Sequence, residues 1–262
     1  MGNEESVCLE HINVIVIGAC GCGKSTLINA IFKEKLAQTS RPMSKYITCY
    51  TKYESVYNIY DSPGIQLDII SQKHLFNDII YLIREKSKTK DINNFIHCIW
   101  YCVNANTRRI QKYEIDLIKS LMPYEIPIIV VITQSYDIYL TENIIKKLED
   151  MKEKKEFLFN DAIPIIAEDK VFKFSGNIFT CHSYGVDILI KRTNEIISNI
   201  FTLSEKLKTE IDSQNKTGKF KKMNILTVEE IEELTIVESI ANGPQSEVFK
   251  VGQQNQYALK VL

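Results

Sequence analysis

The chain has 262 residues, enough for one large domain or for a domain of ordinary size with a smaller second piece. Apolar residues make up 45% and charged residues 25% of the sequence, which is the balance of a globular protein that folds in water. A net charge of -1 excludes the basic excess of nucleic-acid binders, so we expect no nucleic-acid partner. The seven cysteines form no paired framework, which favours reduced thiols in a cytoplasmic protein.

The N-terminal tail, residues 1–11, contains a short lipidation pattern. It fits the myristoylation motif at Gly2, and Cys8 stands nearby as a second acylation site. The alternative is an acidic, frayed terminus, because the two glutamates of the motif offer no attraction to anionic lipid. No apolar run approaches the roughly 20 residues that span a bilayer. We therefore expect membrane association only if Gly2 is myristoylated.

Strand patterns alternate with helix patterns along most of the chain. Continuous apolar or alternating runs predict strands at residues 12–17, within 51–60, and at 95–103, 126–132 and 163–166. Helical spacing predicts helices at residues 26–32, 73–85, 113–121, 141–157 and 186–200. This order predicts an α/β fold of three layers, α/β/α, with a mostly parallel sheet. A polar, lysine-rich linker is expected at residues 210–224, followed by a short β segment of three strands.

A glycine-rich turn follows the first predicted strand. Its sequence, Gly18-Ala19-Cys20-Gly21-Cys22-Gly23-Lys24-Ser25, fits the P-loop pattern and leads into the first predicted helix at Thr26. Glycines let successive backbone N–H groups point inward at a phosphate, and the positive end of the helix adds to this field. Lys24 is expected to reach the β- and γ-phosphates, and the Ser25 hydroxyl to coordinate Mg²⁺. The sequence therefore predicts a P-loop NTPase fold.

Cys20 and Cys22 lie within this turn. A C-x-C pair lacks the further ligands that zinc needs, so small residues filling a tight loop are the favoured interpretation. A functional alternative stays open, because thiols at a helix N-terminus have a lowered pKa and are readily oxidised.

A second motif, Asp61-Ser62-Pro63-Gly64, closes the strand predicted within residues 51–60. Asp61 is placed to hold a Mg²⁺-bound water, and the Gly64 amide to contact a γ-phosphate. Alone this would be an ordinary turn, but behind a P-loop it indicates a γ-phosphate sensor.

The order and spacing of these motifs resemble the G domains of Era-like, HSR1-related GTPases of the 50S ribosome-binding type, and more loosely those of AIG1-type proteins. The resemblance covers residues 12–200 and implies a G domain at residues 12–209 that binds GTP or GDP with Mg²⁺. It places Ser44 of the Arg41–Ile47 segment at the switch I position that meets Mg²⁺, with Thr48 as the second candidate. The implied nucleotide contacts are Gly18, Gly21, Cys22, Gly23, Lys24, Ser25, Thr26, Gly64, Thr133, Gln134, Asp137 and Ala167, and the implied metal ligands are Ser25, Ser44 and Asp61.

Three departures from the family pattern affect the expected activity. The guanine-specificity motif Asn-Lys-x-Asp is replaced by Thr133-Gln134-Ser135-Tyr136-Asp137, which sets the aspartate one residue late and weakens base discrimination. Ile65 follows Gly64 where Ras-like proteins carry a water-positioning glutamine, so intrinsic hydrolysis should be slow unless a regulatory protein or a homodimer completes the site. Gln66 is the weaker substitute. Ser44 replaces threonine and keeps the hydroxyl. No catalytic side chain is identified.

The last segment, residues 225–262, resembles the beginning of a protein kinase N-lobe. The resemblance implies an ATP site with Gly243 in the glycine-rich loop, Val248 against adenine and Lys260 as the Val-Ala-Ile-Lys lysine. The later catalytic motifs are absent from the sequence, so no phosphoryl transfer is expected from this fragment; the alternative is a small β-hairpin appendage.

The sequence as a whole favours a GTP-binding protein that hydrolyses GTP to GDP as a slow, Mg²⁺-dependent switch. Two alternatives stay open: a nucleotide-binding interaction module without significant hydrolysis, and a P-loop protein that uses ATP.

Overall fold

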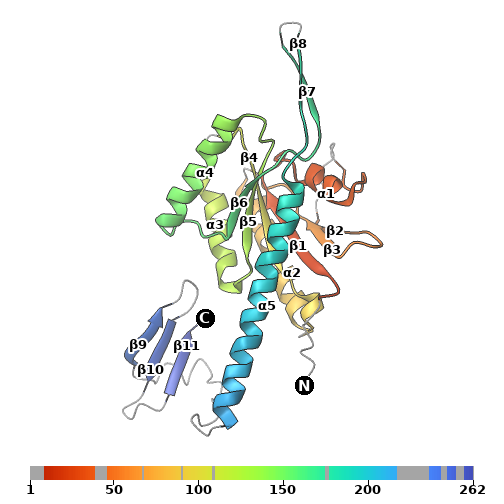
Figure 1. The fold of residues 1–262 in the computed structure, drawn as a ribbon. Helices are drawn as coiled ribbons and strands as arrows, with labels where there is room; N and C mark the ends of the chain where they lie inside the picture. The colour runs from red at the N-terminus through yellow and green to blue at the C-terminus, as the bar shows by residue number, and fades with distance from the viewer. Residues whose placement is uncertain are drawn as a thin grey trace. The chain divides into compact units, whose positions relative to one another are not determined.

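The computed structural model describes residues 9–38, 46–66, 68–89, 91–107, 110–174, 177–216, 236–242, 247–251 and 257–261. The chain divides into two compact units, Met1–Asn199 and Ile200–Leu262 (Figure 1). The predicted tail with Gly2 and Cys8, and Ser44 of the predicted metal set, lie outside the described residues.

The first unit is built on a six-stranded sheet with the order β2-β3-β1-β4-β5-β6. Its strands are β1 (Ile12–Gly18), β2 (Thr48–Thr51), β3 (Tyr57–Asp61), β4 (Cys98–Asn104), β5 (Ile128–Thr133) and β6 (Asp161–Pro164). All neighbouring pairs are parallel except β2 with β3. Parallel strands require helical crossovers that cover both faces, so the predicted three-layer α/β fold is confirmed.

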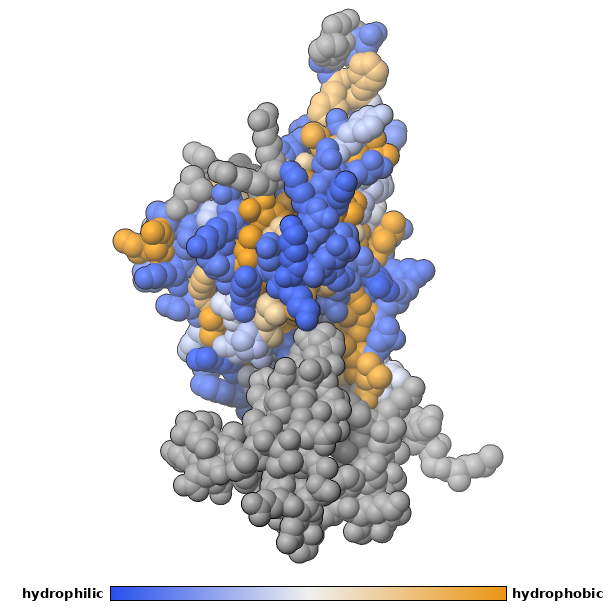
Figure 2. Space-filling model, turned by 90° about the vertical axis from the view of Figure 1, so that its left-hand side faces the viewer, coloured by the Kyte–Doolittle hydropathy of each residue, from blue (hydrophilic) through white to orange (hydrophobic). Residues whose placement is uncertain are grey.

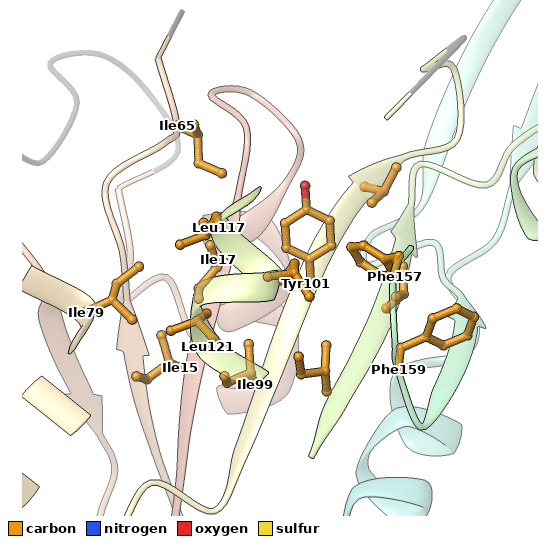
Figure 3. Close-up of a cluster of buried hydrophobic side chains, with 14 of the residues drawn as sticks. Ile15, Ile17, Ile65, Ile79, Ile99, Tyr101, Leu117, Leu121, Phe157 and Phe159 are labelled. Atoms are coloured by element: carbon orange, nitrogen blue, oxygen red, sulfur yellow. The ribbon is translucent and has the colours of Figure 1, made fainter. Parts of the chain in front are cut away.

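Two layers of helices cover the sheet (Figure 1). They are α1 (Lys24–Phe32), α2 (Ile69–Ser87), α3 (Lys112–Leu121), α4 (Ile138–Glu153) and α5 (Val186–Lys216), with short 3-10 turns η1 (Ile92–Asn94) and η2 (Met122–Tyr124). On one face Ile15, Ile99 and Tyr101 of the strands pack with Ile79 of α2 and with α3, as Figure 3 shows. Side chains of a strand alternate between its faces, so the intervening residues are buried on the other face.

That other face is joined to α5 by polar contacts inside an apolar layer. Trp100 of β4 is fully buried, and its Nε1 donates to Thr193 Oγ1 at 3.0 Å. The Tyr57 hydroxyl donates to Asn194 Oδ1 at 2.6 Å. The ring of Tyr57 packs at a tilt against the ring of Trp100, with the two centroids 6.0 Å apart. Burying an indole N–H or a phenol without a partner is costly, so these pairs fix how α5 lies on the sheet.

Several predicted boundaries were wrong, and each has a local cause. Helix α2 begins at Ile69 rather than near Lys73, because the Asp68 side chain caps it by accepting from Ser71 N at 2.8 Å. Helix α5 continues to Lys216 instead of ending near Ile200, so the first residues of the predicted linker are helical. The sequence there keeps an apolar residue every four positions, at Leu203, Leu207 and Ile211, which sustains helical spacing.

Two differences concern strands. The single strand predicted within residues 51–60 is instead the antiparallel pair β2 and β3, and a later hairpin was not predicted at all. A β-hairpin of β7 (Lys170–Phe174) and β8 (Asn177–Cys181) follows β6 and pairs only with itself. Val171, Ile178 and Phe179 are more than half exposed, and the hydrophobic side chains of the hairpin are visible at the top of Figure 2. A two-stranded ribbon has no buried face, so its sequence carries no inward–outward alternation to detect.

The second unit contains an antiparallel sheet of β9 (Ile236–Asn242), β10 (Glu247–Val251) and β11 (Tyr257–Val261) in the order β11-β10-β9. The prediction of three strands is confirmed. Val248 of β10 and Lys260 of β11 are direct partners across the ladder, whereas Gly243 lies outside the described residues. The kinase resemblance of this segment stays a prediction.

Within the described part of the chain, no helix combines the length and the apolar character needed to cross a bilayer.

Candidate nucleotide site

The phosphate loop joins β1 to α1 and has the backbone that its glycines predict. Gly21 and Gly23 have φ values of 75° and 98°, in the left-handed region that glycine adopts without strain. Gly23 is also the N-cap residue of α1, and it has no side chain that could cap the helix. The first amide groups of α1 and the positive end of its dipole are thus directed at the loop. This is a ready binding place for an anion.

Lys24 is buried beside this loop, with 7% of its surface exposed. Its Nζ donates to the carbonyl oxygens of Gly18 at 3.0 Å and Ala19 at 3.1 Å. None of the ion pairs formed by the described residues involves Lys24. A buried ammonium group held only by neutral carbonyls favours an anionic ligand, because burial without a compensating charge is costly.

Ser25 and Asp61 meet next to Lys24. Ser25 Oγ lies 3.5 Å from Asp61 Oδ2, and Asp61 is 9% exposed. Asp61 Oδ1 is the only buried side-chain oxygen or nitrogen among the described residues that has no hydrogen-bond partner. Burial raises the pKa of the Asp61 carboxyl to about 6, although the charge of Lys24 and the Ser25 hydroxyl both lower it.

These groups fit Mg²⁺. A hydroxyl oxygen and a carboxylate are ligands that this hard cation prefers, and the unpartnered Oδ1 is an acceptor with nothing to accept from. A divalent cation would also remove the electrostatic cost of a buried carboxylate. Thr48, the second switch I candidate, is the direct antiparallel partner of Asp61 in the β2–β3 ladder.

The turn after Asp61 is fastened to the phosphate loop. Ile65 N donates to Gly18 O at 3.1 Å, and Cys20 N donates to Ile65 O at 3.3 Å, which forms a parallel bridge between Ala19 and Ile65. A Cβ on Gly64 would lie 2.7 Å from Cys20 Cα, so only glycine fits there. The Ile65 side chain is 3% exposed and belongs to the core of the sheet, while Gln66 is exposed.

The loop after β5 lies against the phosphate loop as well. Thr133 is buried, and its hydroxyl donates to Cys22 O, with Val103 O at 3.2 Å as the other acceptor in reach. Gln134 Nε2 lies 3.5 Å from Gly21 O. The structure thus brings Thr133 and Gln134 to the phosphate loop, whereas their predicted contact with the nucleotide stays a prediction.

Asp137, the predicted base contact, lies at the start of α4, and its contact with a base stays a prediction. It is the N-cap residue of α4, and its Oδ1 accepts from Leu140 N at 3.0 Å. Ala167 follows β6 and is half-buried next to the Ile166–Tyr184 bridge. Tyr184 in turn donates its hydroxyl to Ser135 O at 3.3 Å, which links this turn to the loop that follows β5.

Sequence reasoning missed a residue below the phosphate loop. Cys102 of β4 is 1% exposed and forms a hydrogen bond with the thiol of Cys22. It stands inside a continuous apolar strand, where a cysteine reads as one more core residue and gives no signal of its own. Tyr184 was also missed, because no pattern connects it with Ser135 across about fifty residues of chain.

A mostly parallel sheet, a glycine-rich loop between β1 and α1, and the adjacent Ser25 and Asp61 are the features of a P-loop nucleotide-binding protein. The family described as 50S ribosome-binding GTPase matches residues 13–134. The probable GTP-binding protein EngB of Kosmotoga olearia is 30% identical over 154 residues, which cover 58% of this chain and 77% of EngB. Cell division control protein 10 of Candida albicans is 23% identical over 87% of this chain, which spans 66% of that relative's length.

Solved structures agree on the fold. Toc33 from Arabidopsis thaliana, in complex with Mg²⁺ and GMPPNP, superposes with a TM-score of 0.53 at 13% identity, over 73% of this chain and 86% of Toc33. Dimerization is important for the GTPase activity of the chloroplast translocon components atToc33 and psToc159.

This chain belongs to the 50S ribosome-binding GTPase family of P-loop proteins. It is a GTP-binding protein, and GTP hydrolysis is the reaction of its class.

Proposed function

We propose that the protein hydrolyses GTP to GDP slowly and with Mg²⁺ as cofactor, and so acts as a molecular switch. One observation carries the proposal: the buried Lys24 forms no ion pair with any described residue. It stands beside Ser25 and Asp61, and one carboxylate oxygen of Asp61 lacks a hydrogen-bond partner among these residues. Together these groups provide one site for a phosphate chain and one for the metal that accompanies it.

The proposed roles follow from the chemistry of each group. Gly18, Gly21, Cys22 and Gly23 surround the phosphates with backbone amides, and Lys24 offsets their charge. Ser25 and Asp61 hold Mg²⁺, with Thr48 or Ser44 from switch I. The metal neutralises the charge that develops on the phosphate oxygens. Gly64 contributes its amide at the γ-phosphate position.

Slow hydrolysis is supported by the position of Ile65. A residue that orients the attacking water must reach the γ-phosphate with a polar group, and Ile65 is an apolar residue packed in the core. Gln66 is exposed and its carbonyl accepts from Gln72 Nε2 at 2.8 Å. An activating regulatory protein or a second copy of the chain would supply the missing group. Myristoylation at Gly2 would bring the switch to a membrane.

Weak guanine selectivity is supported by Asp137. Its carboxylate caps α4, so contact with a guanine base competes with the hydrogen bond from Leu140 N. The preference for GTP over ATP should therefore be smaller than in a G domain with an intact Asn-Lys-x-Asp motif.

Binding of GTP, GDP and ATP, with and without Mg²⁺, followed by single-turnover hydrolysis, tests the proposal. We expect Mg²⁺-dependent GTP binding, a modest preference over ATP and a slow first turnover. GTP binding without any hydrolysis would instead favour a nucleotide-binding interaction module. This second candidate is supported by the buried, apolar Ile65 at the position where a water-orienting residue is expected. Equal or tighter ATP binding would contradict the guanine assignment.

A further inference from the structure

Two thiols meet underneath the phosphate loop. Cys22 comes from the loop and Cys102 from the centre of β4, and both are almost completely buried. A Cβ placed on Gly18 would lie 2.8 Å from Cys22 Sγ and 3.1 Å from Cys102 Cβ. The two side chains therefore share the space that the missing side chain of Gly18 leaves, and their thiols are hydrogen-bonded to each other.

We propose that Cys22 and Cys102 form a reversible disulfide under hydrogen peroxide, and that this bond releases nucleotide by displacing the phosphate loop. Formation of the disulfide does not rest on the proposed function, because it needs only the two thiols and the peroxide. Its effect on nucleotide rests on GTP binding at this loop.

The chemistry assigns a separate part to each thiol. The hydrogen bond from Cys102 lowers the pKa of Cys22 against the opposing effect of burial, and the charge of Lys24 lowers it further. The same hydrogen bond, together with burial, raises the pKa of Cys102. Cys22 directly precedes Gly23, the N-cap residue of α1, and a helix N-terminus favours a thiolate, so Cys22 is the nucleophile and Cys102 the resolving thiol.

The reaction proceeds in two balanced steps. The Cys22 thiolate attacks one oxygen of hydrogen peroxide, the O–O bond breaks, and the products are a sulfenic acid and a hydroxide that takes up a proton to become water. The Cys102 sulfur then attacks the Cys22 sulfur, loses its proton and expels a second water. The two thiols give up two electrons, and peroxide is reduced to two molecules of water.

The bond strains the loop rather than the strand. A disulfide brings its two sulfur atoms to about 2.0 Å, which is much shorter than the distance between two sulfurs in van der Waals contact. Cys102 lies in the middle of the sheet and is held by both neighbouring strands, so Cys22 must move. Its backbone N donates to Ala19 O at 3.3 Å, and its carbonyl accepts from Thr133. Movement of this peptide shifts the amides that face the phosphates and misaligns the hydrogen bonds that they donate, which weaken steeply away from ideal geometry.

The test uses the full chain, nucleotide-free, treated with hydrogen peroxide and digested without reductant after its remaining thiols are blocked. We expect mass spectrometry to find the Cys22 peptide linked to the Cys102 peptide. Affinity for a fluorescent GDP analogue should fall at least tenfold and recover with dithiothreitol.

Cys102→Ser removes the resolving thiol. At the peroxide dose that links the two cysteines of the wild-type protein, this variant should keep its nucleotide affinity. At high peroxide it should lose affinity, and dithiothreitol should not restore it. Cys181 is a half-buried thiol on β8, and Cys181→Ser is the matched control. This variant should lose nucleotide affinity under peroxide as readily as the wild-type protein. A Cys20–Cys22 link, peroxide adducts on Cys20 alone, or equal sensitivity of Cys102→Ser would overturn the proposal. The linked peptide with unchanged affinity would overturn its regulatory half, whereas no GDP binding before oxidation would contradict the nucleotide site itself.

Discussion

Asp61 is expected to destabilise the nucleotide-free protein, and Asp61→Asn should reveal by how much. Burial raises the pKa of this carboxyl from an ordinary value of 3.8 to about 6. Above the folded-state pKa the fold must hold a buried negative charge that the unfolded chain keeps in water. A shift of this size corresponds to a cost of about 3 kcal/mol at neutral pH.

The sign of the pH dependence follows from proton binding. Between pH 3.8 and about 6 the folded protein binds more protons at Asp61 than the unfolded chain does, so the free energy of unfolding falls as the pH rises through this window. Above it the penalty is complete and constant. Asparagine keeps the shape and removes the charge, so the variant should gain about 1 to 3 kcal/mol near pH 7.5, because its amide still needs partners.

Urea unfolding of both proteins, without nucleotide or Mg²⁺, measures this difference at several pH values. The advantage of Asp61→Asn should shrink as the pH falls through 6 and disappear near 4. The same variant should lose the Mg²⁺-dependent part of its GTP affinity. An equally or less stable variant at neutral pH, or an advantage that does not depend on pH, would refute the reasoning.

Three further predictions concern single contacts. Lys24→Ala should weaken GTP and GDP binding by about a hundredfold or more, since it removes a charge-assisted contact to phosphate, whereas the exposed Lys33→Ala at the end of α1 should not change it. Thr133→Val should weaken both nucleotides about tenfold by freeing Cys22 O, and Thr133→Ser should retain most of the affinity. Thr193→Val should lower the free energy of unfolding by about 1–3 kcal/mol because it leaves Trp100 Nε1 unpaired. Calorimetry measures this loss, with Thr193→Ser as the control. An unchanged melting temperature for Thr193→Val would contradict the role of this hydrogen bond.

The layers of the fold and the phosphate loop were predictable because each has a local signature. β1, β4 and β5 are continuous apolar runs, and the glycines with Lys24 and Ser25 form one short motif. The β7–β8 hairpin was not predictable, because Val171, Phe172 and Phe179 lie on a ribbon with no buried face to impose a period.

The fine structure of the site depends on contacts between distant segments. Cys22 of the phosphate loop meets Cys102 of β4 and Thr133 of β5 only once the sheet is assembled, and no spacing in the sequence encodes that meeting. Asp137 was predicted as a base contact from its place near the end of β5. An aspartate ahead of a helix is also a typical cap, and the structure shows this second role, which the spacing alone did not indicate.

Trp100 is the single tryptophan of the chain, fully buried and hydrogen-bonded to α5, and it stands two residues from Cys102 on β4. Its fluorescence therefore comes from one environment, in contact with the ring of Tyr57, and unfolding transfers it from an apolar layer to water. The protein thus carries an intrinsic optical probe at its centre. Its emission spectrum therefore reports the separation of α5 from the sheet.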